Sequence, residues 1–274
     1  MLVGSFRASI YEASRAAKDN FVFRARTQAL FRPDTSDLST GGHVGVSPSH
    51  LVDRLRVDGF ALIPGFLTDE EVKALRQAMD SSSDDQGLAR PAPGNDRRIY
   101  FADELFALAK EFKEDPPLRS LGESYLKTDL TSLFTLLARV SPTKDDLGSG
   151  GSWHQDSRAP QFKAMVYLSA VECAEDGAFQ IVRGSNRFAR KMINALRRTE
   201  PSGGDRWTVR EVDLLKQRGD IATVLGNAGD CLIFDSSSLH RGHPVRTHPR
   251  YAMTNYYFPS NFDLVKVRRQ FVRR

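Results

Sequence analysis

Two separated stretches of the sequence carry side chains that could bind a metal ion. In Trp153-His154-Gln155-Asp156 an imidazole and a carboxylate stand two residues apart, and His240 supplies a second imidazole farther along the chain. Residues i and i+2 of an extended strand point to the same side, so His154 and Asp156 could contact one ion together. Two histidines and one carboxylate on one face form the facial triad that binds ferrous iron and leaves positions open for oxygen chemistry. We therefore predict an iron site made of His154, Asp156 and His240.

The second histidine of this site is chosen by its position after a strand. His240 comes soon after the apolar run Leu232-Ile233-Phe234, from which a barrel strand could aim it inward. His243 and His248 lie nearby and compete with it as ligands. Their separation from the strand favours His240, and His243 is better explained as a residue that contacts solvent or substrate.

A further basic residue could hold a carboxylate cosubstrate. Arg250 opens the apolar strand Tyr251–Phe258, ten residues after His240. An arginine at a barrel mouth can bind the far end of a dicarboxylate through its bidentate guanidinium fork. Arg246 competes for this role, but it stands in the turn between Pro244 and Pro249.

The bulk composition is that of a globular protein with a basic excess. The chain has 274 residues, is 40% hydrophobic and 27% charged, and carries a net charge of +5. No apolar run approaches the ~18 residues of a membrane span, and we expect no secretion, because the first residues show no apolar core followed by a small-residue cleavage site. Cys173 and Cys231 do not make a disulfide framework, so we predict reduced core cysteines in a cytoplasmic protein. The basic tail, residues 266–274, comes without a zinc finger or RNA-binding motif, so a nucleic-acid partner is not favoured.

Short apolar strands separated by turn signals dominate the second half of the chain. We expect strands at Phe134–Val140, Trp153–Asp156, Phe162–Ala170, Ala178–Val182, Ile221–Leu225, Cys231–Asp235 and Tyr251–Phe258. Ahead of them, Thr68 and Glu71 make a capping box that predicts a helix start, and apolar residues between Leu105 and Phe112 predict a second helix. This order indicates a mostly β fold with flanking α: a cupin-like jelly roll packed by N-terminal helices.

The breakers in the sequence suggest how the chain is divided. Residues 1–50 mix basic, Ser and Gly residues and are predicted to form a helical arm and a loop. Residues 51–274 would then be one β domain. Residues 187–219 interrupt the series of strands with a charged segment, which we predict to be a helical insert.

From about residue 51 to 258 the chain resembles the phytanoyl-CoA dioxygenase family of iron(II)- and 2-oxoglutarate-dependent oxygenases. The most specific matches are the Trp153–Asp156 motif and Arg250-Tyr251-Ala252. The others are the run Gly59–Leu67, the pairs Asp176-Gly177 and Gly184-Ser185, and Gly229-Asp230 through His240. The resemblance implies a double-stranded β-helix, the same architecture as the jelly roll expected from the strands.

The resemblance also implies roles for single residues. His154, Asp156 and His240 would bind Fe(II), and Arg250 would pair with the distal carboxylate of 2-oxoglutarate. Arg139 lies on the strand before the iron motif, where related enzymes place a basic residue near the cosubstrate. Tyr167 could donate a hydrogen bond to the cosubstrate. For both residues a purely structural role, in solvent or in the core, stays open.

The expected reaction is the hydroxylation of an unactivated C–H bond of a small molecule. It would consume O2 and convert 2-oxoglutarate to succinate. Related halogenases replace the iron-binding carboxylate with a small residue, so the presence of Asp156 favours hydroxylation. Arginines at 97 and 98 and in the 187–219 insert point to an anionic substrate, although a solvated basic loop explains them as well. The alternative function is a non-catalytic jelly-roll protein that keeps the pocket for binding or sensing. Nothing in the sequence determines the oligomeric state.

Overall fold

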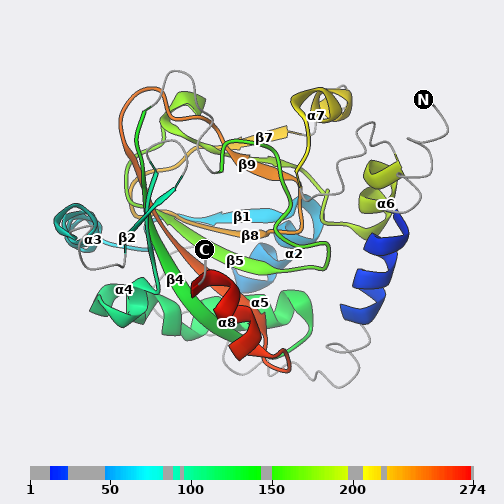
Figure 1. Ribbon diagram of the computed structural model, residues 1–274, viewed down its shortest axis with the longest axis horizontal. Coiled ribbons are helices and arrows are strands. Elements are labelled where there is room, and N and C mark those ends of the chain that lie inside the picture. The colour runs from blue at the N-terminus through cyan, green and yellow to red at the C-terminus, as the bar shows by residue number, and fades with distance from the viewer. Residues whose placement is uncertain are drawn as a thin grey trace.

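The computed structural model describes residues 13–23, 47–82, 89–92, 96–142, 150–196, 206–216 and 221–272. Two antiparallel β-sheets face each other, and helices cover the outer side of the larger sheet (Figure 1). Side chains from both sheets meet in a shared apolar cluster that includes Met165, Phe179 and Leu232. The fold is therefore the predicted jelly roll with flanking helices.

The larger sheet has seven strands and the smaller one has three. In spatial order the larger sheet consists of β1 (Phe60–Ile63), β8 (Cys231–Asp235), β5 (Phe162–Tyr167), β10 (Arg250–Pro259), β4 (Leu130–Val140), β3 (Asp96–Tyr100) and β2 (Ala89–Ala92). The smaller sheet consists of β7 (Ile221–Val224), β6 (Phe179–Val182) and β9 (His240–Gly242). Strands β2, β3 and β4 are neighbours both along the chain and in the sheet, as are β6 and β7. The other pairs, such as β1 with β8 and β4 with β10, join strands distant in the sequence, as expected for crossing jelly-roll connections.

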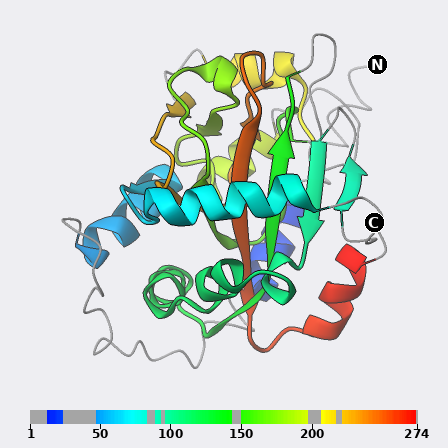
Figure 2. The ribbon, with the colours of Figure 1, turned by 90° about the vertical axis from the view of Figure 1, so that its left-hand side faces the viewer.

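The helices pack mainly through apolar faces. In chain order they are the described helix at residues 13–23, α2 (Pro48–Asp58), α3 (Asp69–Ser81), the 3-10 turn η2 (Ala102–Glu104), α4 (Ala107–Glu114), α5 (Pro116–Leu126), η3 (Ala174–Asp176), α6 (Phe188–Leu196), α7 (Val209–Lys216) and α8 (Leu264–Val272). Turned by a quarter, the molecule shows α3 (cyan) crossing in front of the strands and α8 (red) at the lower right (Figure 2). Leu75 of α3 and Phe112 of α4 share one buried cluster with Met253 of β10.

Strand β10 separates this helical layer from the interior between the sheets. Its residues alternate between the two faces, as the pleat of a strand requires. Tyr251, Met253 and Tyr257 join the core under the helices. Arg250, Ala252, Thr254, Tyr256 and Phe258 line a cavity between the sheets. Positions of even number on β10 therefore face the interior, where a site can form.

Several local predictions are confirmed and others are wrong. The capping box begins α3 as predicted, because the Thr68 backbone N–H donates to Glu71 and the Glu71 N–H donates to the Thr68 hydroxyl. The helix predicted around Leu105–Phe112 is α4, but a further helix, α5, follows it directly. Proline fits the first turn of a helix, where its missing N–H is not needed, and Asp115 caps that turn. Strands β2 and β3 occupy a stretch for which no strand was predicted.

The predicted extension and insert are only partly described. The helix at residues 13–23 packs onto the domain through Phe23, which is buried, and through Asn20, which donates to the Arg158 carbonyl. Residues 1–12 and 24–46 lie outside the described residues, so the boundary at residue 50 stays a prediction. The insert contains α6 and α7, while residues 197–205 and 217–220 are likewise outside. Within the described ranges, no helix combines the length and apolar character that crossing a membrane requires.

Candidate metal and cosubstrate site

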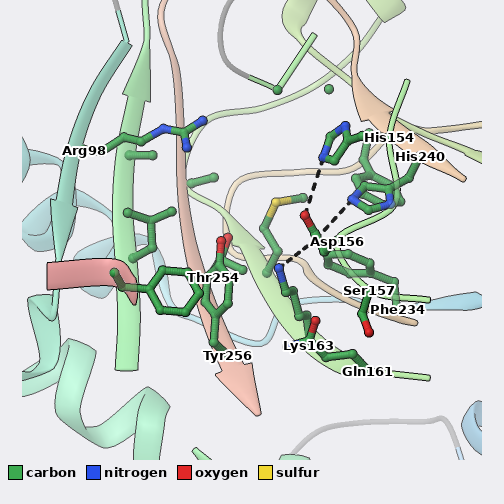
Figure 3. A pocket seen from close by; sticks show the side chains of 18 of the residues that line it. Arg98, His154, Asp156, Ser157, Gln161, Lys163, Phe234, His240, Thr254 and Tyr256 are labelled. Atoms are coloured by element: carbon green, nitrogen blue, oxygen red, sulfur yellow. Dashed lines mark hydrogen bonds and ion pairs between the residues drawn. The ribbon is translucent and has the colours of Figure 1, made fainter. Parts of the chain in front are cut away.

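The predicted metal ligands come together at one point between the two sheets. His154, Asp156 and His240 each place one possible ligand atom within 4.8 Å of the others. The Nε2 atom of His154 lies 3.7 Å from the Asp156 carboxylate, and that of His240 lies 3.5 Å from it. Figure 3 shows the three side chains converging. Two imidazoles and one carboxylate are a donor set suited to ferrous iron with open positions, so the residues fit the predicted ion.

Main-chain pairing brings the ligands together across a gap of more than eighty residues. His154 and His240 exchange both backbone hydrogen bonds at 2.9 Å, and the Asp156 N–H donates to the Ser236 carbonyl. A strand was predicted at Trp153–Asp156, and this prediction is wrong. Within that stretch only His154 forms β-bridges, and these are isolated. The convergence of His154 and Asp156 therefore depends on pairing with the segment before β9.

Each histidine is oriented by a backbone carbonyl. The Nδ1 atom of His154 lies 2.7 Å from the Ser152 oxygen, and Nδ1 of His240 lies 2.8 Å from the Ser238 oxygen. Because a carbonyl only accepts, each Nδ1 carries the proton and each Nε2 keeps its lone pair for a metal. Burial, with the neighbouring His240, lowers the pKa of His154 to about 4. His154 is therefore neutral at physiological pH, as a metal ligand must be.

Lys163 was not predicted to be a site residue, yet it contacts Asp156, one of the three candidate metal ligands. Its ammonium lies 2.7 Å from the Asp156 carboxylate and 3.8 Å from the ring centre of Tyr256. Burial opposes the charge on Asp156, but Lys163 and the two histidines outweigh it and hold the pKa of Asp156 well below its usual range. Lys163 thus keeps Asp156 ionised and fixes one of its oxygens.

Behind the ligands, Asp235 organises the turn that bonds to them. Its carboxylate accepts hydrogen bonds from the Gln161 and Ser237 backbone N–H groups and from the Tyr125 hydroxyl. The turn it holds supplies the carbonyls of Ser236 and Ser238, which bond to Asp156 and His240. Asp235 therefore supports two ligands without touching either. Its place at the end of an apolar strand was the only sequence signal for this role.

The three ligands line a cavity of about 530 Å³ that also contains Arg250. The Nη1 atom of Arg250 donates to the Gly177 carbonyl at 2.7 Å, while its buried Nε has no hydrogen-bond partner among the described residues. Burial lowers the pKa of Arg250, and the nearby Arg98 lowers it further. A buried donor without a partner, on a guanidinium in a cavity, fits the carboxylate of an organic acid such as 2-oxoglutarate.

The loop under Arg250 depends on one glycine and one aspartate. Gly177 has φ +84°, and a Cβ there would lie 2.7 Å from Val245 and 3.0 Å from Arg250, so only glycine fits. Asp176 accepts hydrogen bonds from the Thr247 hydroxyl at 2.6 Å and from the Cys173 N–H at 3.0 Å. These bonds, first of all the one from Thr247, lower the pKa of Asp176 to about 2.

The variant Asp176→Asn should be less stable than the wild type by about 2 kcal/mol at pH 7. The carboxylate's folded-state pKa of about 2 lies below its ordinary 3.8. Its stabilisation is therefore complete above pH 3.8 and is lost as the pH falls toward 2. Urea unfolding at pH 7 and pH 3 measures both effects, and the exposed neighbour variant Glu175→Gln serves as the control. Equal stability of the Asp176 variant and the wild type at pH 7 would contradict this role.

Two predicted cosubstrate contacts need correction. Arg139 of β4 does not line the cavity, and its guanidinium pairs with Asp80 of α3 at 3.1 Å. It pairs in register with Tyr251, on the face of the sheet that the helices cover, whereas Leu136 and Ala138 face the cavity. Because successive residues of a strand point to opposite faces, Arg139 points away from the cavity, toward the helices.

Tyr167 is buried in the core behind the cavity and is not one of its lining residues. Its hydroxyl donates to the Val224 carbonyl and accepts from the Phe179 N–H, both at 3.0 Å. Both hydrogen-bonding roles of the hydroxyl are thus taken by the smaller sheet, and burial raises its pKa to about 12. Tyr167 therefore joins the two sheets through its hydroxyl.

A basic residue that does face the cavity is Arg98 of β3 (Figure 3). It is close enough to Arg250 to lower the pKa of that guanidinium. It lies 3.6 Å from the Asp96 carboxylate. In the sequence, Arg97 and Arg98 only suggested an anionic substrate. Because no strand was predicted there, nothing indicated which of the two arginines would point inward.

Comparison with known proteins adds independent information. The sequence profile described as phytanoyl-CoA dioxygenase (PhyH) matches residues 55–251. An ectoine dioxygenase of Bordetella bronchiseptica is 23% identical over 251 residues, covering 82% of this chain and 80% of that protein. An ectoine dioxygenase of Nocardia farcinica is 23% identical over 209 residues, covering 67% and 68%.

Solved structures share the fold. HygX from Streptomyces hygroscopicus, solved with nickel, 2-oxoglutarate and hygromycin B, superimposes with a TM-score of 0.56 at 17% identity, covering 78% of this chain and 88% of that one. The epimerase SnoN, in complex with Fe3+, alpha-ketoglutarate and nogalamycin RO, gives a TM-score of 0.56 at 17% identity, covering 78% and 84%. At these identities the likeness concerns the fold alone.

Proposed function

The chain belongs to the phytanoyl-CoA dioxygenase family of iron(II)- and 2-oxoglutarate-dependent dioxygenases, and on that premise we propose that it hydroxylates an unactivated C–H bond of a small-molecule metabolite. The observation that carries this proposal is the cluster of His154, Asp156 and His240 in one cavity with Arg250. The retained carboxylate, Asp156, supports hydroxylation over halogenation. When bound, the iron supplies the oxidation that couples the conversion of 2-oxoglutarate and O2 into succinate and CO2 to hydroxylation of the substrate.

The protein's own groups would prepare the site for that chemistry. The Nδ1–H groups of His154 and His240 donate hydrogen bonds to backbone carbonyls, so each histidine would present Nε2 to the ion. Lys163 would hold one oxygen of Asp156 and leave the other for the metal. Arg250, with Arg98 close to it in the same cavity, would bind the distal carboxylate of 2-oxoglutarate and so orient its other end toward the metal.

The structure narrows the evidence for an anionic substrate. Of the arginines that suggested one, Arg98 and Arg206 line the cavity. Arg197 and Arg198 lie outside the described residues. Arg98 lies close to Arg250 and would therefore contact the cosubstrate rather than the substrate. Of these arginines, Arg206 remains to pair with an acidic group on the substrate. A cytoplasmic location is part of the same proposal, and both Cys173 and Cys231 are free thiols, as a reducing compartment favours. Cys231 is buried as predicted, whereas Cys173 is exposed and is not a core residue.

Succinate release tests the proposal against the non-catalytic alternative. Iron-loaded protein incubated with 2-oxoglutarate, O2 and pooled metabolites should form succinate above the level seen without metabolites. A protein that only binds or senses would bind 2-oxoglutarate, measured by calorimetry, and release no succinate across the whole panel. That second result would replace the proposed hydroxylase with the binding function.

A further inference from the structure

One end of the cavity is walled by aromatic side chains from several elements. They are Phe23 of the N-terminal helix, Tyr100 of β3, Tyr256 and Phe258 of β10, Phe262 in the following turn and Phe271 of α8. Tyr256 lies six residues beyond Arg250 on the same face of β10, about 20 Å along a strand. The aromatic wall is therefore well removed from the arginine that would hold the cosubstrate.

Lys163 connects this aromatic end to the metal cluster. It contacts the Asp156 carboxylate on one side and the ring of Tyr256 on the other, at 2.7 and 3.8 Å. Figure 3 shows Tyr256, Lys163 and Asp156 in succession along the cavity. A molecule resting against the aromatic wall would thus reach the metal cluster.

Helix α8 closes the outer side of this wall. Its apolar face, made of Leu264, Val267 and Phe271, packs against the cluster around Phe134, yet no residue of the helix is fully buried. The Phe271 ring lies 4.7 Å from Phe134 and 5.8 Å from Tyr256, centre to centre. Val267 and Phe271 also line the cavity. They therefore keep apolar surface that a bound molecule could cover.

The charges at this end disfavour a cation. The carboxylates among the described lining residues are Asp96 and Asp156, and each lies beside a basic side chain, Arg98 and Lys163 respectively. The Tyr256 ring, which could attract a cation, already carries the Lys163 ammonium over its face. Arg98 and Lys163 would therefore repel a positively charged ligand.

We propose that the substrate bears an apolar ring system without positive charge, which lies against Phe271 and Tyr256 and presents a C–H bond to the metal cluster. This inference rests on the proposed function for the identity of the site. It adds the class of substrate and makes α8 part of the binding wall. Apolar area and ring packing supply the affinity, and Phe271 contributes to specificity.

The test uses full-length protein loaded with Zn(II), which is redox-inactive, and saturated with 2-oxoglutarate. The probe is 2-naphthoate, a ring-bearing anion, and binding is measured by calorimetry. Wild type should bind it, Phe271→Ala should bind roughly tenfold more weakly, and Phe271→Trp should bind like wild type. Val265→Ala, at a position 64% exposed on the same helix, is the matched control and should bind unchanged.

Three results would overturn the inference. They are equal binding by Phe271→Ala and wild type, displacement of 2-oxoglutarate by the probe, and tighter binding of the positively charged probes choline and 2-naphthylmethylammonium than of 2-naphthoate. Should Phe271→Ala fail to fold, as judged by near-UV circular dichroism, Phe271→Leu removes the ring while keeping apolar bulk and is expected to weaken binding too.

Succinate assays with the iron-loaded enzyme separate this inference from the proposed activity. If ring binding depends on Phe271 but no compound yields succinate, the inferred aromatic binding site is supported and the hydroxylase activity is refuted. Succinate formed only with positively charged compounds would do the reverse.

Discussion

Asp156→Ala should abolish metal binding and reduce succinate formation to background. Substituting groups that merely support a ligand typically costs about 10–100-fold in metal affinity, so removing a ligand of the triad should cost more than 100-fold. The same change leaves the Lys163 ammonium, which is 5% exposed, without its carboxylate partner. The metal-free variant should therefore also lose up to about 3 kcal/mol of stability.

A double variant separates these two effects. In Asp156→Ala/Lys163→Met both charges are gone, so the free energy of unfolding of the metal-free protein should recover toward the wild-type value. Metal binding should not recover, because the carboxylate is still missing. Urea unfolding measures the stability and calorimetry with Zn(II) measures the affinity. Wild-type metal affinity in Asp156→Ala would rule out this carboxylate as a ligand.

Arg250→Ala should raise the KM for 2-oxoglutarate by roughly 30-fold or more. Truncating one partner of a buried, hydrogen-bonded charge pair typically costs about 2–5 kcal/mol. Each 1.4 kcal/mol is about tenfold in affinity, so the lower limit corresponds to roughly 30-fold. The loss should lie mainly in KM, because the guanidinium would bind a part of the cosubstrate that does not react. Arg250→Lys should fall in between, since an ammonium keeps the charge and loses the fork. Initial rates of succinate formation over a range of 2-oxoglutarate concentrations give both constants.

Two arginines serve as matched controls for this experiment. Arg139→Ala removes a guanidinium from β4 that pairs with Asp80 outside the cavity, and Arg246→Ala removes an exposed one from the turn before β10. Neither should change the KM for 2-oxoglutarate appreciably. An increase in Arg139→Ala as large as in Arg250→Ala would show that strand parity does not decide which arginine binds the cosubstrate.

The main features of the fold and the residues of the site could be read from local patterns. Most of the predicted apolar runs form strands, namely β4, β5, β6, β7, β8 and β10. The capping box at Thr68 begins α3. Local chemistry decides such features, because a capping residue or a turn glycine acts within a few positions. The pairing of a histidine and a carboxylate with a distant histidine was likewise visible, since few other sets of ligands suit ferrous iron.

Orientation could not be read in the same way. Strand β4 is buried on both faces between Leu133 and Leu137, where leucines stand on each face, so its pattern does not show which residues face the cavity. A shift by one residue exchanges the faces, and that single ambiguity misplaced Arg139. For Tyr167 the inward direction was right, but the backbone of the smaller sheet engages its hydroxyl.

By itself, then, the sequence determined the kinds of elements and pointed to the candidate ligands and to Arg250, because those depend on residue type and on position beside a strand. Only the tertiary structure decided that Lys163 pairs with Asp156, that Arg98 enters the cavity and that α8 brings Phe271 to Tyr256. Each of these contacts joins segments whose separation in the chain carries no local signal. They form because two sheets and a terminal helix bury apolar surface together, and the packing of those layers sets which side chains meet.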